Sequence, residues 1–91
     1  MSNKFSVFEK SKSIEILVAL YGKDKLFLSE LLVKLDTKDT NTINRRIESL
    51  RTAGLINEEG EAKFGGRRYI WLTEKGKKIA SSLSEIKKIM K

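Results

Sequence analysis

The chain has 91 residues, of which 40% are hydrophobic and 34% are charged, a composition that predicts one small globular domain. It contains no cysteine and no histidine, which excludes disulfides, cysteine nucleophiles, histidine general bases and the common zinc sites. The longest apolar run, Ile16 to Tyr21, is far shorter than the roughly 20 residues of a transmembrane helix, and no export signal is recognisable. We therefore expect a cytoplasmic protein that is not an enzyme and needs no cofactor, metal or membrane.

The charge of the chain is unevenly distributed. The net charge is +7, and residues 38–91 account for +6 of it, with eight lysines and five arginines against seven acids. All five arginines lie between Arg45 and Arg68. Such a cluster predicts a polyanionic partner, most often nucleic acid, although a lysine-rich solvated surface is the simpler alternative. Frequent lysine and glutamate without cysteine also resembles the composition of thermophilic, archaeal-like proteins.

The N-terminal part of the chain predicts an arm followed by a helix. Residues 1–10 read as the arm, in which Ser6 and Glu9 match a capping box that would start a short helix near Val7. Ser11 or Ser13 can cap the next helix, which is expected to end at Gly22. Its predicted core positions recur at helical spacing: Ile14, Leu17, Val18 and Tyr21.

Two further helices follow, with a tight turn between them. The run 26–28 is long enough for a minimal strand, after which Ser29 is expected to cap a helix whose core positions are Leu31, Leu32 and Leu35. Residues 36–38 allow only a tight turn, and Asp39 can cap a third helix that runs to about Ala53. Two helices joined by so short a turn indicate a helix-turn-helix.

The remainder of the chain predicts a hairpin and a last helix. Gly54 stands where a helix C-terminal glycine is expected, 55–58 and 67–72 read as two strands, and 59–66 is the polar loop between them. Thr73 can cap a helix that continues to the C-terminus. The predicted fold is thus α+β and mostly helical, a winged helix-turn-helix with its domain at 11–73 and a dimerisation helix at 74–91.

Three segments resemble the winged helix-turn-helix transcriptional regulators of bacteria and archaea, in the broad MarR, ArsR and PadR style. The resemblance lies in Asn41–Ile47, in Leu50–Ile56 and in Tyr69–Gly76, which includes the run Leu-Thr-Glu-Lys-Gly. It covers about half of the chain. Lys38 departs from the pattern, because these proteins often have an apolar residue at that point. The resemblance implies double-stranded DNA as the partner.

The third predicted helix has one apolar and one polar face. At about 100° per residue, Ile43, Ile47 and Leu50 share the core side, and Asn41, Arg45 and Glu48 lie opposite. Arg pairs with guanine and Asn with adenine in the major groove, so Arg45 is the first candidate for base reading. The full set of expected DNA contacts from the turn and this helix is Lys38, Thr40, Asn41, Thr42, Asn44, Arg45 and Arg46. The alternative is that these side chains only solvate an exposed helix.

The hairpin is expected to act as the wing. Lys63, Arg67 and Arg68 would lie on or near its tip, against the DNA backbone or in the minor groove.

The last helix predicts a homodimer. Ile79, Leu83, Ile86 and Met90 follow one another at steps of four, three and four, as in a short coiled-coil seam, and Phe5 and Phe8 could join the interface. A single small core needs only the first half of this helix, so a second copy would cover the rest. The alternative is that the whole stripe packs within one chain.

The leading function is therefore a sequence-specific, homodimeric DNA-binding regulator. Two alternatives stay open: an architectural protein that coats DNA with little sequence preference, and a winged helix that binds other proteins.

Overall fold

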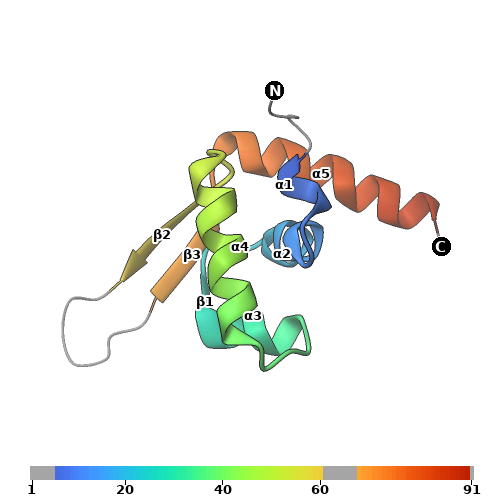
Figure 1. Ribbon diagram of the computed structural model, residues 1–91. Coiled ribbons are helices and arrows are strands. Elements are labelled where there is room, and N and C mark those ends of the chain that lie inside the picture. Colours follow the sequence, from blue (N-terminus) through green and yellow to red (C-terminus); the bar gives the residue numbers. More distant parts are fainter. Residues whose placement is uncertain (1–5, 61–67, 91) are drawn as a thin grey trace.

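The computed structural model describes residues 6–60 and 68–90 (Figure 1). In chain order the elements are α1 (Ser6–Glu9), α2 (Ser13–Leu20), β1 (Leu26–Phe27), α3 (Leu28–Lys34), α4 (Thr40–Thr52), β2 (Ile56–Gly60), β3 (Arg68–Leu72) and α5 (Glu74–Ile89). The predicted α+β, mostly helical winged helix-turn-helix is confirmed. Within the described ranges, no helix is both long enough and apolar enough to cross a bilayer.

The three strands form one antiparallel sheet in the order β1-β3-β2. The wing strands pair from Ile56 opposite Leu72 to Gly60 opposite Arg68, so β2 extends two residues beyond the predicted end at Glu58. The short strand β1 adds Leu26 opposite Ile70. Alternation along β3 buries Ile70 and Leu72.

One hydrophobic core lies between this sheet and the helices. Its fully buried side chains include Ile43, Ile47 and Leu50, which confirms the predicted inner face of α4. The other core members are Ile16, Leu17, Leu20, Leu26, Leu31, Leu55, Ile56, Ile70, Leu72 and Ala80. The position of α4 over the core therefore turns its polar side outward.

The predicted face of α2 is correct only at Leu17. The buried positions are Ser13, Ile16, Leu17 and Leu20, whereas Ile14 and Tyr21 are 39% and 43% exposed. The helix carries apolar residues on two adjacent stripes, and both recur at helical spacing, so the period alone does not choose between them. The stripe left outside becomes one wall of the groove described below.

Two predicted helix starts are wrong as well. Helix α3 begins at Leu28, before Ser29, because the Glu30 carboxylate accepts the Phe27 backbone N–H at 2.9 Å. Helix α2 begins at Ser13 after Lys12, whose φ is 71°, and no side chain caps it. The Ser13 hydroxyl is buried and has no partner in the part of the chain that the structure describes.

The start of α5 is fixed against the end of α4. Thr73 accepts the Gly76 N–H at 3.0 Å, which confirms the predicted cap, and its hydroxyl donates to the Gly54 carbonyl at 2.7 Å. Gly54 has a φ of 80°, a conformation that glycine adopts without strain. A Cβ on Gly76 would lie 1.9 Å from the Leu55 carbonyl oxygen, so only glycine lets α5 approach this backbone.

Candidate nucleic-acid interface

The turn before α4 and the first turn of α4 form a polar, exposed segment. Asp39 caps the helix as predicted: its carboxylate accepts the Thr42 N–H at 3.1 Å and the Thr42 hydroxyl at 2.6 Å. These bonds, with the nearby Arg45 charge, hold the pKa of Asp39 below its usual value. The hydroxyl proton of Thr42 is therefore committed to Asp39, whereas Lys38 and Thr40 are exposed beside it.

The outward face of α4 carries the uncommitted donors. Asn41 and Arg45 are both exposed, and among the described residues no acceptor is recorded for the Arg45 guanidinium. The acid on the same face is paired, since Arg51 donates to both oxygens of Glu48. This bond raises the pKa of Arg51. The negative charge of Glu48 is thus offset, and within the described ranges Arg45 has no hydrogen-bonded or ion-paired partner.

Arg46 has a partner within the fold. Its Nε donates to the Ser11 carbonyl at 2.9 Å, which ties α4 to the segment between α1 and α2. The side chain stands at the edge of the apolar face, as its helical position indicates. Its first role is to hold the N-terminal segment against α4.

Arg68 also has two partners in the structure. Its Nη1 donates to the Asn44 Oδ1 at 2.5 Å, and its Nη2 pairs with a carboxylate oxygen of Glu58. The residue lies at the start of β3, where alternation places it on the same side of the strand as Ile70 and hence toward α4. Arg68 therefore links the recognition helix candidate to the base of the wing.

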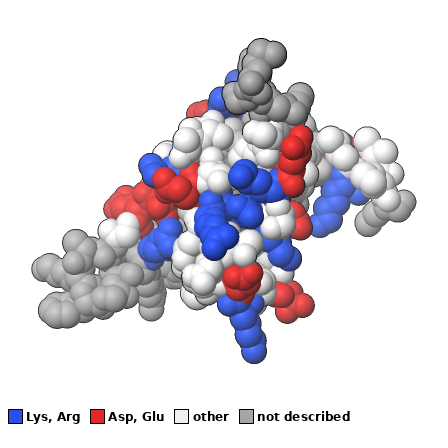
Figure 2. Space-filling model, in the orientation of Figure 1, with Lys and Arg blue, Asp and Glu red and all other residues white. Residues whose placement is uncertain are grey.

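Two of the predicted wing residues, Lys63 and Arg67, lie outside the described residues. The described part of the wing consists of β2, up to Gly60, and β3, from Arg68. On the described surface, basic side chains gather over the centre of the face where α4 lies, and acidic side chains lie mainly toward its edges (Figure 2). The fold thus presents a basic face with α4 at its middle.

Sequence reasoning missed Glu58 and the bond that fixes Arg68. A signal for it was present, because the alternation that buries Ile70 and Leu72 also turns Arg68 inward. The partner of Arg46 had no such signal, since Ser11 is 35 residues away in sequence.

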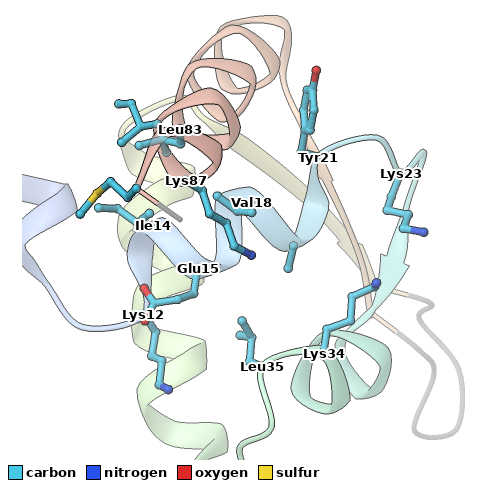
Figure 3. Close-up of a pocket in the computed structure, with 13 residues that line it drawn as sticks. Lys12, Ile14, Glu15, Val18, Tyr21, Lys23, Lys34, Leu35, Leu83 and Lys87 are labelled. Atoms are coloured by element: carbon cyan, nitrogen blue, oxygen red, sulfur yellow. The ribbon is translucent and has the colours of Figure 1, made fainter.

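A second feature of the surface is a groove of about 840 Å³ between α2 and α5 (Figure 3). Its apolar walls come from the outer stripe of α2 and from the last turns of α5: Ile14, Val18, Leu83, Ile86 and Met90. Lysines stand at its rim, among them Lys12, Lys34 and Lys87. The groove is thus apolar in its walls and basic at its edge.

The predicted dimer residues divide into two groups. Phe8, Ile79 and Leu83 pack partly against the core of their own chain, whereas Ile86 is 50% exposed and Met90 is 79% exposed. The stripe therefore does not pack entirely within one chain, and the last turns of α5 extend past the body of the fold (Figure 1). Phe5 lies outside the described residues.

The sequence matches no family model, and the search of curated proteins found no relative for it. The structure is nevertheless similar to solved structures. A MarR-family protein from Porphyromonas gingivalis W83 superposes with a TM-score of 0.83 at 18% identity, covering 97% of this chain and 92% of that one. A PadR-like transcription factor from Bacteroides fragilis gives 0.73 at 21% identity, covering 98% and 92%.

A third similar structure is FabT of Streptococcus pneumoniae, which was solved in complex with DNA. Its TM-score is 0.73 at 18% identity, with 88% of this chain and 55% of that chain covered, so this chain spans just over half of FabT. Together with the helix-turn-helix and the wing strands described above, these likenesses show that the chain has the winged helix-turn-helix fold found in MarR-family and PadR-like proteins.

Proposed function

We propose that this protein is a cytoplasmic transcriptional regulator that binds double-stranded DNA sequence-specifically as a homodimer. The observation that carries the proposal is the outward face of α4, where Arg45 and Asn41 are exposed and unpaired among the described residues while the acid beside them, Glu48, is offset by Arg51. A helix with free Arg and Asn donors over a basic surface suits the major groove. FabT, which shares the fold, was solved with DNA, and this supports the same partner here.

The proposed contacts fall into two classes. Arg45 and Asn41 read base edges, with Asn44 beside them. Lys38, Thr40 and the backbone N–H groups of the first turn of α4 meet phosphates, which position the helix without reading sequence. Lys63 and Arg67 are proposed to contact the backbone or the minor groove from the wing.

Thr42, Arg46 and Arg68 have contacts inside the fold as well. Thr42 donates to Asp39, Arg46 to Ser11 and Arg68 to Asn44. We propose that they hold the reading side chains in place, and that any contact they make with phosphate is secondary.

The homodimer is proposed to form through the last turns of α5. Ile86 and Met90 leave apolar surface exposed beside the groove, and a second copy of the chain would cover both. Leu83, Ile79, Phe8 and Phe5 would flank this contact. A two-fold dimer carries two α4 helices, and a separation of about 34 Å between them would place both in successive major grooves, with an inverted repeat as the site.

The test is selection of bound duplexes from a random DNA pool, with the wild type and with Arg45→Ala. The proposal predicts a recovered motif that is lost or relaxed in Arg45→Ala, with weaker nonspecific binding retained. Lys78→Ala is the matched control, since it removes the same charge from an exposed site on α5 and should leave the motif intact.

Two results would contradict the proposal. Binding without any recovered motif would favour the architectural alternative, since specific sites are usually preferred by about 10³- to 10⁷-fold. A shallow salt dependence would favour a protein-interaction module, because about six phosphate contacts give a slope of log K on log salt near −5.

A further inference from the structure

Asn44, one of the candidate base readers, is held by a side chain from the wing. Arg68 donates from Nη1 to the Asn44 Oδ1 at 2.5 Å, and the same guanidinium pairs with Glu58. The Arg68 and Glu58 side chains are 34% and 24% exposed, so both ends of this link are sheltered. Helix α4 and both wing strands therefore meet at the Arg68 guanidinium.

The chemistry of the guanidinium fixes the orientation of the Asn44 amide. A guanidinium has donors only, so the amide atom that faces it must be the oxygen. Rotating the amide by 180° would set the NH₂ group against a donor and break the bond. The two Nδ2 hydrogens therefore point away from Arg68, and no acceptor for them is recorded among the described residues.

Free asparagine prefers adenine because its oxygen accepts from N6 while its nitrogen donates to N7. In this structure the bond from Arg68 turns the oxygen toward β3 and fills one of its two lone pairs, so the NH₂ group is the free end of the amide. Guanine offers two acceptors in the major groove and thymine offers one, whereas adenine sets a donor beside its acceptor.

We infer that Arg68 is a specificity-determining residue: by holding the Asn44 oxygen toward β3 it leaves the NH₂ group as the end of the amide that meets a base, which favours guanine or thymine over adenine at one base of the site. This inference rests on the proposed function, because it concerns the base preference of the same interface between α4 and DNA. Glu58 is the positioning residue, because its carboxylate pairs with the same guanidinium that donates to Asn44.

The constraint applies to one position of the interface. Asn41 and Arg45 are exposed on the outward face of α4, with no such partner among the described residues. Their base preferences should therefore be independent of Arg68, and this independence gives the experiment an internal reference.

The experiment is selection of bound duplexes with the wild type, Arg68→Met, Asn44→Ala and the double variant. Asn44→Ala identifies the base that Asn44 reads, because the selected motif should lose its base preference at that position. Arg68→Met keeps the stem next to Gly60 but has no donor, so the Asn44 oxygen becomes free. Lys78→Met is the matched control for a lost positive charge, since Lys78 is exposed on α5.

The inference predicts guanine or thymine at the Asn44 position for the wild type. In Arg68→Met, adenine at that position should gain roughly 5- to 150-fold relative to the wild type, the size of one good bidentate contact. The double variant should have no preference there, and Lys78→Met should keep the wild-type base. Thermal melting of each variant checks that the fold persists.

Three results would overturn the inference. Adenine at the Asn44 position in the wild type would do so, as would a base preference that Arg68→Met leaves unchanged, or an Asn44→Ala motif identical to the wild-type motif. In each of these a motif is still recovered, so the proposed function survives. A wild type that recovers no motif at all would overturn both.

Discussion

At the scale of the residue, the arginines near α4 have different environments. Arg45 alone among the described ones has no partner, whereas Arg46 bonds the Ser11 carbonyl, Arg51 pairs with Glu48 and Arg68 links Asn44 to Glu58. The cluster of arginines was visible in the sequence. The sequence did not show which of these arginines are bonded within the fold, because the partners of Arg46 and Arg68 come from other parts of the fold.

A prediction at this scale concerns Gly76. In Gly76→Ala the new methyl group would overlap the Leu55 carbonyl, at 1.9 Å, and a backbone atom cannot rotate away. We expect a loss of about 3 kcal/mol in the free energy of unfolding, measured by urea titration.

Gly60→Ala is the matched control for this prediction. The nearest atom to a Cβ at Gly60 is the Arg68 Cγ at 3.9 Å, an ordinary contact, so the free energy of unfolding should change by less than about 1 kcal/mol. Equal effects of the two substitutions would show that the approach of α5 to Leu55 is not as close as described.

At the scale of the element, α4 could be predicted closely and α2 could not. Helix α4 has a single apolar stripe, Ile43, Ile47 and Leu50, and an acid at its cap, so both its face and its start were readable. In α2 two apolar stripes compete, and the packing of α5 and the sheet decides which is buried. Strand ends also depended on contacts that the local sequence does not display, whereas the bond from Phe27 to Glu30 that starts α3 is local.

The cap of α4 gives a prediction about pH. The pKa of Asp39 is lowered from 3.8 by the bonds from Thr42, so its stabilisation is complete above pH 3.8 and is lost as the pH falls through the lower folded value. Wild type should be more stable than Asp39→Asn at pH 7, and the difference should shrink to near zero at acid pH, where Asp39 is protonated.

Urea unfolding midpoints of both proteins between pH 7 and pH 2 measure this difference. Glu59→Asn is a control, since Glu59 is an exposed acid outside any helix cap. A gap between wild type and Asp39→Asn that stays constant with pH would contradict the described cap.

At the scale of the whole molecule, two surfaces are left for partners. One is the basic face over α4, and the other is the apolar groove between α2 and α5 with the exposed end of α5. We assign the first to DNA and the second to another copy of the chain. The two surfaces involve different elements, so a dimer would leave both α4 helices accessible.

The dimer is tested with Ile86→Glu. A carboxylate at this half-exposed position would be buried in the proposed interface without a partner, and we expect a sedimentation mass near that of one 10.4 kDa chain instead of two. Val33→Glu is the matched control, since Val33 is 79% exposed on α3 and does not line the groove. A wild-type mass of one chain at high concentration would contradict the proposed assembly.

The central claim is that the outward side of α4 meets duplex DNA. Amide shift mapping tests it most directly: the ¹⁵N-labelled chain is titrated with a duplex recovered by selection. The account predicts the largest shifts at residues 38–48, with the start of β3 next, and small ones at the outer end of α5. Shifts confined to the groove between α2 and α5, with residues 38–48 unmoved, would contradict it.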